Sequence, residues 1–234
     1  MKWKSNRLVL ILSGIIVTIF IAASLVIIFF FPELLPSRTG AQNETTTEIF
    51  AMDTYITMTA YGRNAEIALW NAEDKLIELE QLWSVTDPDS DIYAVNHSDG
   101  QPVNVSEETA ELLKNVGYER IRLEDPTVQL DKDMMLDLGS VGKGYAGDLT
   151  AQVLKDNGIT SALLDLGGNI QAVGIKSDGS PWRLGLRDPF SDGTLGVLVI
   201  SDQAVVTSGN YERYFIGEDG KQYGHIIVHV IQDE

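Results

Sequence analysis

The stretch that decides the fold is Met134–Gly174, with the sequence MMLDLGSVGKGYAGDLTAQVLKDNGITSALLDLGGNIQAVG. A short apolar strand is predicted to end at Asp137-Leu138, and a glycine-rich loop follows over residues 139–144. The next segment predicts a helix over Tyr145–Asn157. It stops at Gly158, because glycine readily takes the left-handed conformation of a helix C-cap. This order of strand, loop and helix indicates a fold that contains both α-helices and β-strands.

Two further strands are predicted in the stretch, Ala162–Leu166 and Ile170–Val173, separated by Gly167-Gly168-Asn169. A strand, a glycine loop and a helix N-terminus can offer backbone N–H groups to an anion, usually a phosphate. Asp137 before the loop and Lys143 within it are residues that a Mg²⁺-assisted phosphate site would use. The alternative is a glycine-rich turn that only lets the helix pack closely on the strand.

The loop matches neither of two common nucleotide-binding motifs. Its glycines, Gly139, Gly142 and Gly144, do not follow the G-x-G-x-x-G spacing of dinucleotide-binding folds. Gly144 also occupies the position where a P-loop has Ser or Thr after Gly-Lys. The spacing by itself therefore leaves the ligand open.

The beginning of the chain predicts a membrane anchor. Lys2, Lys4 and Arg7 precede an uncharged apolar run, Leu8–Phe31. At about 1.5 Å per residue this run is long enough to cross a hydrocarbon core of about 30 Å. A cleavable signal peptide usually has a shorter apolar core, of about 7–15 residues, so an uncleaved anchor is favoured. The basic residues predict a cytoplasmic N-terminus and an extracytoplasmic domain. We divide the chain into an anchor (1–31), a linker (32–48) and a domain (49–234).

The charge of the chain argues against a nucleic-acid partner. Asp and Glu number 34 against 17 Lys and Arg, which gives a formal net charge of −17. Binding to nucleic acid requires a basic face that neutralises phosphates. An acidic, solvated exterior is the simpler interpretation. The chain has no cysteine, so neither disulfides nor a lipid-modified cysteine are available.

The rest of the domain predicts an α+β fold. Ile49–Tyr61 is rich in β-branched and aromatic residues and predicts a strand. Asn64–Trp83 has an apolar stripe at helical spacing, formed by Ala65, Leu69, Ala72, Leu76, Leu79 and Trp83. Ser106 is the expected N-cap of a short helix that reaches Asn115. Several short strands separated by turns follow the central stretch, an arrangement typical of antiparallel α+β domains.

Five motifs of the chain occur in the order found in one family: DLGSVGKGYAGD, LLDLGGNIQAVG, PWRLGLRDP, VVTSGNYERYF and GHII, within Asp137–Ile227. With them the chain resembles the ApbE family of flavin transferases (FAD:protein FMN transferases). Met52-Asp53-Thr54-Tyr55 is similar to the entry strand of the family, and residues 83–90 are similar to its next turn. The resemblance implies one ApbE-like domain of the T-fold type in a bacterial protein. The predicted anchor places this protein in the cell membrane with a single span.

The resemblance also implies a reaction. FAD is bound, its pyrophosphate is cleaved with Mg²⁺, and FMN passes to a Ser or Thr hydroxyl of a partner flavoprotein subunit of the electron-transport type, with release of AMP. Carried over by motif, Asp137 and Lys143 contact FAD, and Ser140 contributes an oxygen to the metal. Met52 and Ile227 line the flavin or adenine pocket, and His225 is a general base. Read alone, Asp137 could instead cap the loop, Lys143 could be exposed to solvent, and His225 could be structural.

The chain departs from the family pattern in two places. Family members carry several dozen residues between the helix near Asn115 and the equivalent of Val116-Gly117-Tyr118, and this chain lacks them. After Ile227 the family continues with a helix that supplies principal Mg²⁺ ligands, whereas this chain ends at Glu234. These departures predict an incomplete domain with fewer walls around the ligand. They leave two rival hypotheses, an FAD-binding module without transferase activity and a non-functional fragment.

Overall fold

The computed structural model describes residues 43–116, 118–124, 126–207, 209 and 214–224. The chain divides into two compact units, Met1–Gly40 and Ala41–Glu234, and all described residues belong to the second. The predicted anchor, Leu8–Phe31, therefore lies outside the described residues. In the part of the chain that is described, no helix is long and apolar enough to span a membrane.

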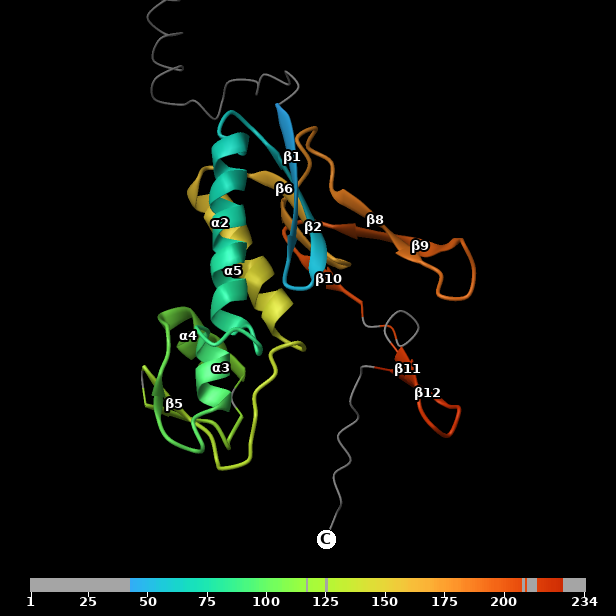
Figure 1. Ribbon diagram of the computed structural model, residues 1–234. Coiled ribbons are helices and arrows are strands. Elements are labelled where there is room, and N and C mark those ends of the chain that lie inside the picture. The colour runs from blue at the N-terminus through green and yellow to red at the C-terminus, as the bar shows by residue number, and fades with distance from the viewer. Residues whose placement is uncertain (1–42, 117, 125, 208, 210–213, 225–234) are drawn as a thin grey trace, which may run out of the picture. The chain divides into compact units, whose positions relative to one another are not determined.

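The centre of the second unit is a five-stranded sheet with the order β1-β2-β6-β7-β10, in which every neighbouring pair is antiparallel (Figure 1). Two-residue turns connect β1 to β2 and β6 to β7, while β2 and β6 pair across a long separation in sequence. The strands are β1 Glu44–Ala51, β2 Thr54–Tyr61, β6 Ser161–Leu166, β7 Asn169–Gly174 and β10 Ala204–Val206.

Two helices, α2 (Ala65–Trp83) and α5 (Gly142–Asp156), pack against each other and against this sheet (Figure 1). Every second residue of β2 is buried toward the helices, since side chains alternate between the two faces of a strand. All six residues of the predicted apolar stripe of α2 are buried, which confirms that the stripe forms core. The fully buried side chains at the centre include Ile56, Met58, Leu76, Leu154 and Leu164.

The opposite face of the sheet carries a smaller apolar cluster. Strands β8 (Trp182–Arg187) and β9 (Thr194–Ile200) form an antiparallel hairpin. Trp182 and Ile200 of this hairpin are buried together with Ala172 of β7. Ala172 pairs with Leu163 of β6, and paired residues share one face of the sheet. The neighbours of Leu163, Ala162 and Leu164, belong to the core on the helix side. Since side chains alternate along a strand, the smaller cluster lies on the side away from α2 and α5. A further hairpin joins β11 (Tyr214–Ile216) to β12 (Gln222–Gly224).

The residues that follow α2 and precede α5 in the sequence form a small lobe, which we call the α3–β5 lobe. The carboxylate of Asp91 accepts hydrogen bonds from the Ser106 N–H (2.9 Å), the Ser106 hydroxyl (2.6 Å) and the Thr109 hydroxyl (2.7 Å). The Trp83 indole N–H donates to Thr109 Oγ1 at 3.2 Å and so ties α2 to the lobe. The lobe consists of α3 Asp91–Asn96, β3 Val103–Asn104, α4 Glu107–Val116, β4 Arg122–Glu124 and β5 Thr127–Gln129, with the sheet order β3-β5-β4.

The mixed α and β composition predicted from the sequence is confirmed, but the single strand predicted over Ile49–Tyr61 is wrong. The structure has a hairpin there, which turns at Met52-Asp53, and β1 begins at Glu44, inside the segment predicted as linker. Both turn residues are left-handed, with φ of 53° and 57°. Two-residue hairpin turns favour such angles and usually place glycine or asparagine there, so a Met-Asp turn carries little sequence signal.

The elements around the glycine-rich loop also differ from the prediction. Residues 134–138 belong to no strand, although an apolar strand was predicted to end at Asp137-Leu138. Helix α5 begins at Gly142 rather than at Tyr145, because the second half of the loop already has helical conformation. The N–H groups of Val141 and Gly142 both donate to the Leu138 carbonyl, at 3.0 and 2.7 Å, which forms a tight turn directly before the helix.

Candidate functional site

Two hairpin turns lie together at one end of the five-stranded sheet, which we call the site end. Ile56 of β2 pairs with Leu166 of β6, so the start of β2 is adjacent to the end of β6. The β1–β2 turn at Met52-Asp53 and the β6–β7 turn at Gly167-Gly168 therefore share this end. They meet closely: a Cβ atom on Gly167 would lie 2.0 Å from Thr54 Oγ1.

The N-terminus of α5 reaches the same end. Gly147 of α5 packs over the end of β6, since a Cβ atom there would lie 3.9 Å from Leu166 Cδ1. Gly142, more than one turn earlier in the helix, packs between Leu138 and Trp83, with 3.6 and 3.8 Å from an added Cβ atom. The glycine-rich loop thus enters α5 beside the last turn of α2.

The chemistry of this helix start favours an anion. The N-cap residue, Val141, makes no side-chain capping hydrogen bond, and the first turn contains no acidic residue. Lys143 lies in this first turn, where a positive charge is unfavourable for the helix by itself because the helix N-terminus already carries partial positive charge. A bound phosphate would interact favourably with both the N–H groups of the first turn and the lysine.

Asp137 and Ser140 are both exposed on the loop before α5. Asp137 Oδ1 accepts a hydrogen bond from the Gly139 N–H at 2.7 Å, which is the bond expected of a loop cap. The exposure of its carboxylate also allows contact with a ligand. The local geometry is therefore compatible with both interpretations of Asp137.

Met52 occupies the left-handed turn between β1 and β2, half-buried against the core. Its N–H donates to the Glu80 carboxylate of α2 at 2.8 Å. Trp83, one turn further along α2, lies next to Gly142 of α5, with 3.8 Å between its Cε3 atom and the position of an added Cβ atom. Since successive turns of one helix hold the two segments, the Met52 turn and the loop before α5 are both fixed against the end of α2.

An aromatic pair lies beside the start of α5. The rings of Trp83 and Tyr145 are 6.1 Å apart, centroid to centroid, at an angle of 34°. Burial raises the pKa of the Tyr145 hydroxyl, and the carboxylates of Glu111 and Glu108 raise it further. Tyr145 therefore stays protonated at neutral pH and can donate a hydrogen bond.

Four residues predicted for the site, Met52, Asp137, Ser140 and Lys143, are described, and all lie in segments that meet at the site end. The other two, His225 and Ile227, lie outside the described residues. The roles that the sequence predicts for all six remain predictions.

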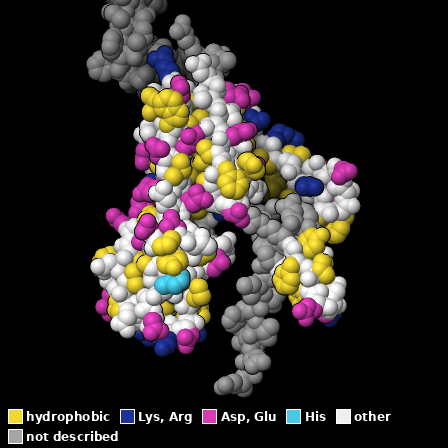
Figure 2. Space-filling model, viewed as in Figure 1, with side chains coloured by type: hydrophobic (Ala, Val, Ile, Leu, Met, Phe, Trp, Pro, Cys, Tyr) yellow, Lys and Arg dark blue, Asp and Glu magenta, His cyan; other side chains and the backbone are white. Residues whose placement is uncertain are grey.

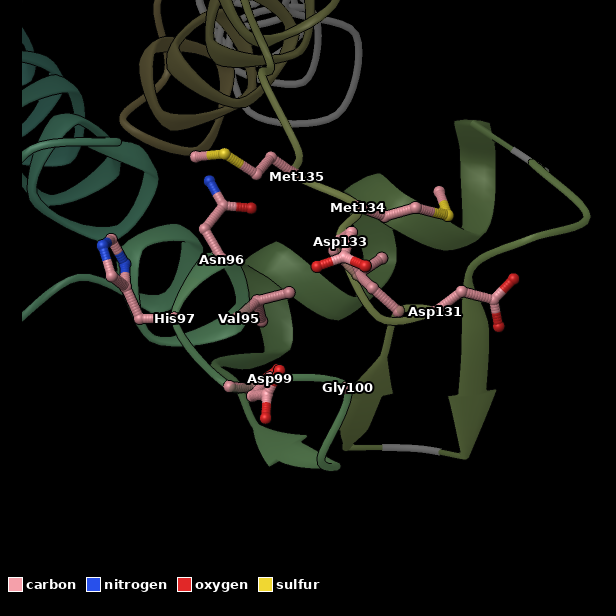
Figure 3. Close-up of a pocket in the computed structure, with 11 residues that line it drawn as sticks. Val95, Asn96, His97, Asp99, Gly100, Asp131, Asp133, Met134 and Met135 are labelled. Atoms are coloured by element: carbon pink, nitrogen blue, oxygen red, sulfur yellow. The ribbon is translucent and has the colours of Figure 1, made fainter.

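A hollow in the surface lies apart from the site end. It has a volume of about 360 Å³ and is formed by the end of α3, the following loop and residues 130–135 (Figure 3). Asp99, Asp131 and Asp133 line it together with Met134 and Met135. Asp131 is paired with Arg120 and Arg122, at 3.5 and 2.5 Å. None of the four described residues predicted for the site lines this hollow.

Acidic side chains are scattered over the visible face of the molecule rather than gathered in one patch (Figure 2). This distribution agrees with a solvated exterior, the interpretation given to the net charge of −17. The described residues contain no group of three or more His, Cys, Asp or Glu that could hold a metal ion.

Sequence reasoning missed two residues that hold the site segments, Glu80 and Asn96. Glu80 bonds to Met52, and the Asn96 carboxamide bonds to the backbone of Leu136. Neither residue belongs to a local motif, and each partner is distant in sequence. Only their hydrogen bonds in the folded chain reveal them.

The model of the ApbE family matches two overlapping segments of the chain, residues 52–116 and 110–229. Together they run from Met52 to His229, well over half of the 234 residues. This chain belongs to the ApbE family. The resemblance predicted from the sequence motifs is thereby confirmed.

Curated relatives of this ApbE-family chain share its central region. The FAD:protein FMN transferase of Treponema pallidum is 46% identical over 112 residues, which cover 43% of this chain and 31% of the relative. An FAD:protein FMN transferase of Klebsiella pneumoniae is 44% identical over 96 residues, 40% of this chain and 28% of the relative. The chain thus spans about a third of the length of these curated relatives.

Solved structures share the fold of this ApbE-family chain. The ApbE protein of Thermotoga maritima has a TM-score of 0.73 at 24% identity, over 79% of this chain and 76% of that protein. The flavinyl transferase ApbE of Pseudomonas stutzeri, in its apo form, has a TM-score of 0.69 at 21% identity, over 79% and 74%. At these identities the likeness shows the ApbE fold.

Proposed function

We propose that this chain is an FAD:protein FMN transferase. The curated relatives that match its central region carry this name. The observation that carries the proposal furthest is the start of α5, which has no capping side chain, no acid in its first turn, and Lys143 there instead. Such a helix start suits the pyrophosphate of FAD better than it suits an unliganded surface turn.

The proposed reaction is a phosphoryl transfer. The oxygen of a Ser or Thr hydroxyl on the acceptor protein attacks the phosphorus of the FMN half of FAD. The bond from that phosphorus to the AMP oxygen breaks, and AMP leaves with the bridging oxygen. The hydroxyl proton passes to a base, so the products are AMP and an FMN phosphoester on the acceptor. Positioning and charge neutralisation supply most of the catalysis in such reactions.

In this proposal the described residues bind and orient FAD. Lys143 and the N–H groups at the start of α5 contact the pyrophosphate, and Asp137 and Met52 contact other parts of the dinucleotide. Two proposed roles fall on residues outside the described ranges: His225 as the base for the acceptor hydroxyl, and Ile227 as part of the pocket wall. The motif resemblance supports these two roles.

Magnesium dependence belongs to the same proposal, and bound Mg²⁺ would neutralise charge on the phosphate oxygens. Asp137 and Ser140 are oxygen donors exposed on the loop, but the Asp137 carboxylate also accepts the Gly139 N–H. Mg²⁺ commonly takes one or two protein carboxylates together with substrate phosphates. The described donors fit an ion held chiefly by FAD rather than a preformed metal cage.

The acceptor and the location of the protein are also proposals. The acceptor would be a flavoprotein subunit of the electron-transport type, with its Ser or Thr presented outside the cytoplasm. The apolar run Leu8–Phe31, preceded by basic residues, supports a bacterial cell-membrane location with a single span and an extracytoplasmic domain.

A second candidate is an FAD-binding module without transferase activity. It is favoured by the start of α5, whose features suit an anion, because binding FAD requires this site but none of the groups that carry out transfer. Titration of the full chain with FAD, followed by flavin fluorescence with and without Mg²⁺, tests binding. Release of AMP and labelling of a Ser- or Thr-containing acceptor then distinguish the transferase from the binding module. A cooperatively folded chain that binds no FAD would contradict both functions.

A further inference from the structure

The segment before the glycine-rich loop is held by a side chain rather than by a strand. The Asn96 Nδ2 group donates to the Leu136 carbonyl at 2.9 Å, and the Leu136 N–H donates to Asn96 Oδ1 at 2.6 Å. One carboxamide thus satisfies both backbone groups of Leu136, as a neighbouring strand would. Residues 134–138 belong to no sheet, so these two bonds take the place of a strand pairing.

Asn96 is itself held in place by the α3–β5 lobe. It is the last residue of α3, whose N-cap, Ser90, accepts the Tyr93 N–H at 3.0 Å and donates to the Ser84 carbonyl at 2.5 Å. The Asp91 carboxylate joins the first turn of α3 to the start of α4. The Asn96 carboxamide points toward the segment that carries Met135 (Figure 3). A short helix fixed at its start can therefore hold this carboxamide in one orientation.

The two hydrogen bonds between Asn96 and Leu136 act on the residues that begin the anion site. Leu136 directly precedes Asp137, whose carboxylate accepts the Gly139 N–H at 2.7 Å. The Leu138 carbonyl then accepts the N–H groups of Val141 and Gly142, where α5 starts. These hydrogen bonds join residues only a few positions apart. A shift of Leu136 would therefore also shift Asp137 and the turn that precedes α5.

We propose that Asn96 is a positioning residue for the anion site at the start of α5. It touches neither ligand nor reacting atoms but acts through Leu136, by fixing the conformation of the loop from Asp137 to Lys143. The consequence for FAD rests on the proposed function. The rival interpretation is that Asn96 only stabilises the α3–β5 lobe, in which case its loss would lower stability without a specific effect on the loop.

The test uses the full 234-residue chain, purified in mild detergent because of its apolar N-terminal run. Asn96→Ala removes both bonds, whereas Asn96→Asp keeps the size and the acceptor for the Leu136 N–H but loses the donor. Gln129→Ala is the matched control, because the Gln129 carboxamide also bonds to the backbone of this lobe, at the Gly100 carbonyl (2.7 Å). Hydrogen exchange at residues 136–139 of the free protein, the melting temperature and the FAD dissociation constant are measured for each variant.

Asn96→Ala is expected to speed exchange at Leu136 and Gly139 and to weaken FAD binding by about tenfold or more, which corresponds to about 1.4 kcal/mol. Gln129→Ala should change stability to a similar extent but leave exchange at these two residues and the FAD affinity unchanged. Asn96→Asp should keep the Leu136 N–H protected and still weaken FAD binding. If Asn96→Ala does not fold, Asn96→Asp decides the question.

Unchanged exchange at residues 136–139 in Asn96→Ala would overturn the proposal, and so would equal losses of FAD affinity in Asn96→Ala and Gln129→Ala. Failure of the wild-type chain to bind FAD would contradict the proposed function instead. The exchange measurement would then still decide whether Asn96 holds the loop, because it requires no ligand.

Discussion

The Glu80 carboxylate accepts the backbone N–H of Met52 at 2.8 Å and so joins the last turns of α2 to the β1–β2 turn. Met52 and Asp53 are both left-handed there, a conformation that is costly for residues other than glycine and is kept only where the surroundings hold it. The bond to Glu80 is one such constraint at the site end.

Glu80→Ala should therefore destabilise the chain by about 1–3 kcal/mol, because it leaves the Met52 N–H without its acceptor. Glu80→Gln retains a carbonyl acceptor and should lose less. Urea unfolding followed by Trp fluorescence measures both. Asp74→Ala, at an exposed position of the same helix, is the control and should stay within about 0.5 kcal/mol of the wild type. Equal stability of Glu80→Ala and wild type would show that the bond contributes nothing.

The two glycines of the β6–β7 turn offer a matched pair of substitutions. Gly167 (φ 66°) has Thr54 Oγ1 2.0 Å from the position of an added Cβ atom, while Gly168 (φ 89°) has no atom within 4 Å. Gly168→Ala should lower the free energy of unfolding by about 1 kcal/mol through backbone strain alone. Gly167→Ala adds a steric clash and should cost more, by about 1–3 kcal/mol. Thermal unfolding of both variants measures the difference, and similar costs would mean that Thr54 moves aside freely.

Lys143→Ala should weaken FAD binding by about tenfold or more, because a charged hydrogen bond to phosphate contributes about 1.5–3 kcal/mol. The variant should keep a cooperative unfolding transition, so that its loss of affinity is not a loss of structure. Fluorescence titration with FAD and thermal unfolding measure the two effects. Lys114→Ala, on the exposed surface of α4, should leave FAD affinity unaltered. Wild-type affinity in Lys143→Ala would remove this residue from the site.

Asp202 provides a pH-dependent contribution to stability. The ion pair with Lys155 (3.0 Å) and the Gly174 N–H (3.1 Å) lower its pKa below the ordinary value of 3.8. A lowered folded-state pKa stabilises the fold above the unfolded-state pKa, and this stability is lost as pH falls through the folded-state value. Asp202→Asn should thus cost at most about 1 kcal/mol at pH 7, because both side chains are largely exposed. In urea unfolding the difference from wild type should shrink as the pH falls below 3.8, the ordinary value of the pKa. A difference that does not change with pH would exclude this ion pair as the cause.

If Leu8–Phe31 is a membrane anchor, the full chain should stay in the membrane fraction after a carbonate wash. Peripheral proteins are released by this treatment, whereas a transmembrane helix is retained by its burial in the hydrocarbon core. Immunoblotting of pellet and supernatant measures the outcome. A mature soluble form that begins near residue 30 would show cleavage and contradict the anchor.

Local sequence signals were enough for much of the fold. The apolar stripe from Ala65 to Trp83 predicts α2 because periodicity at helical spacing is a property of the segment alone. Gly158, with φ 80°, ends α5 as expected of a C-cap glycine. The β6–β7 hairpin follows from two apolar runs around Gly167-Gly168. The ordered motifs also predicted the family, which the family match confirms.

The tertiary structure alone decided how the site is held. A strand was predicted before the loop, but residues 134–138 belong to no strand, and Leu136 is bonded instead to the Asn96 side chain, 40 positions away. The Met52 turn was missed because its angles depend on Glu80, from another element, and not on a glycine. Local propensity acts over a few residues, whereas these hydrogen bonds join residues 28 and 40 positions apart and form only when the tertiary fold brings them together. The sequence by itself therefore determined the elements and the family, and the packing of α2, α3 and α5 determined the geometry at the site end.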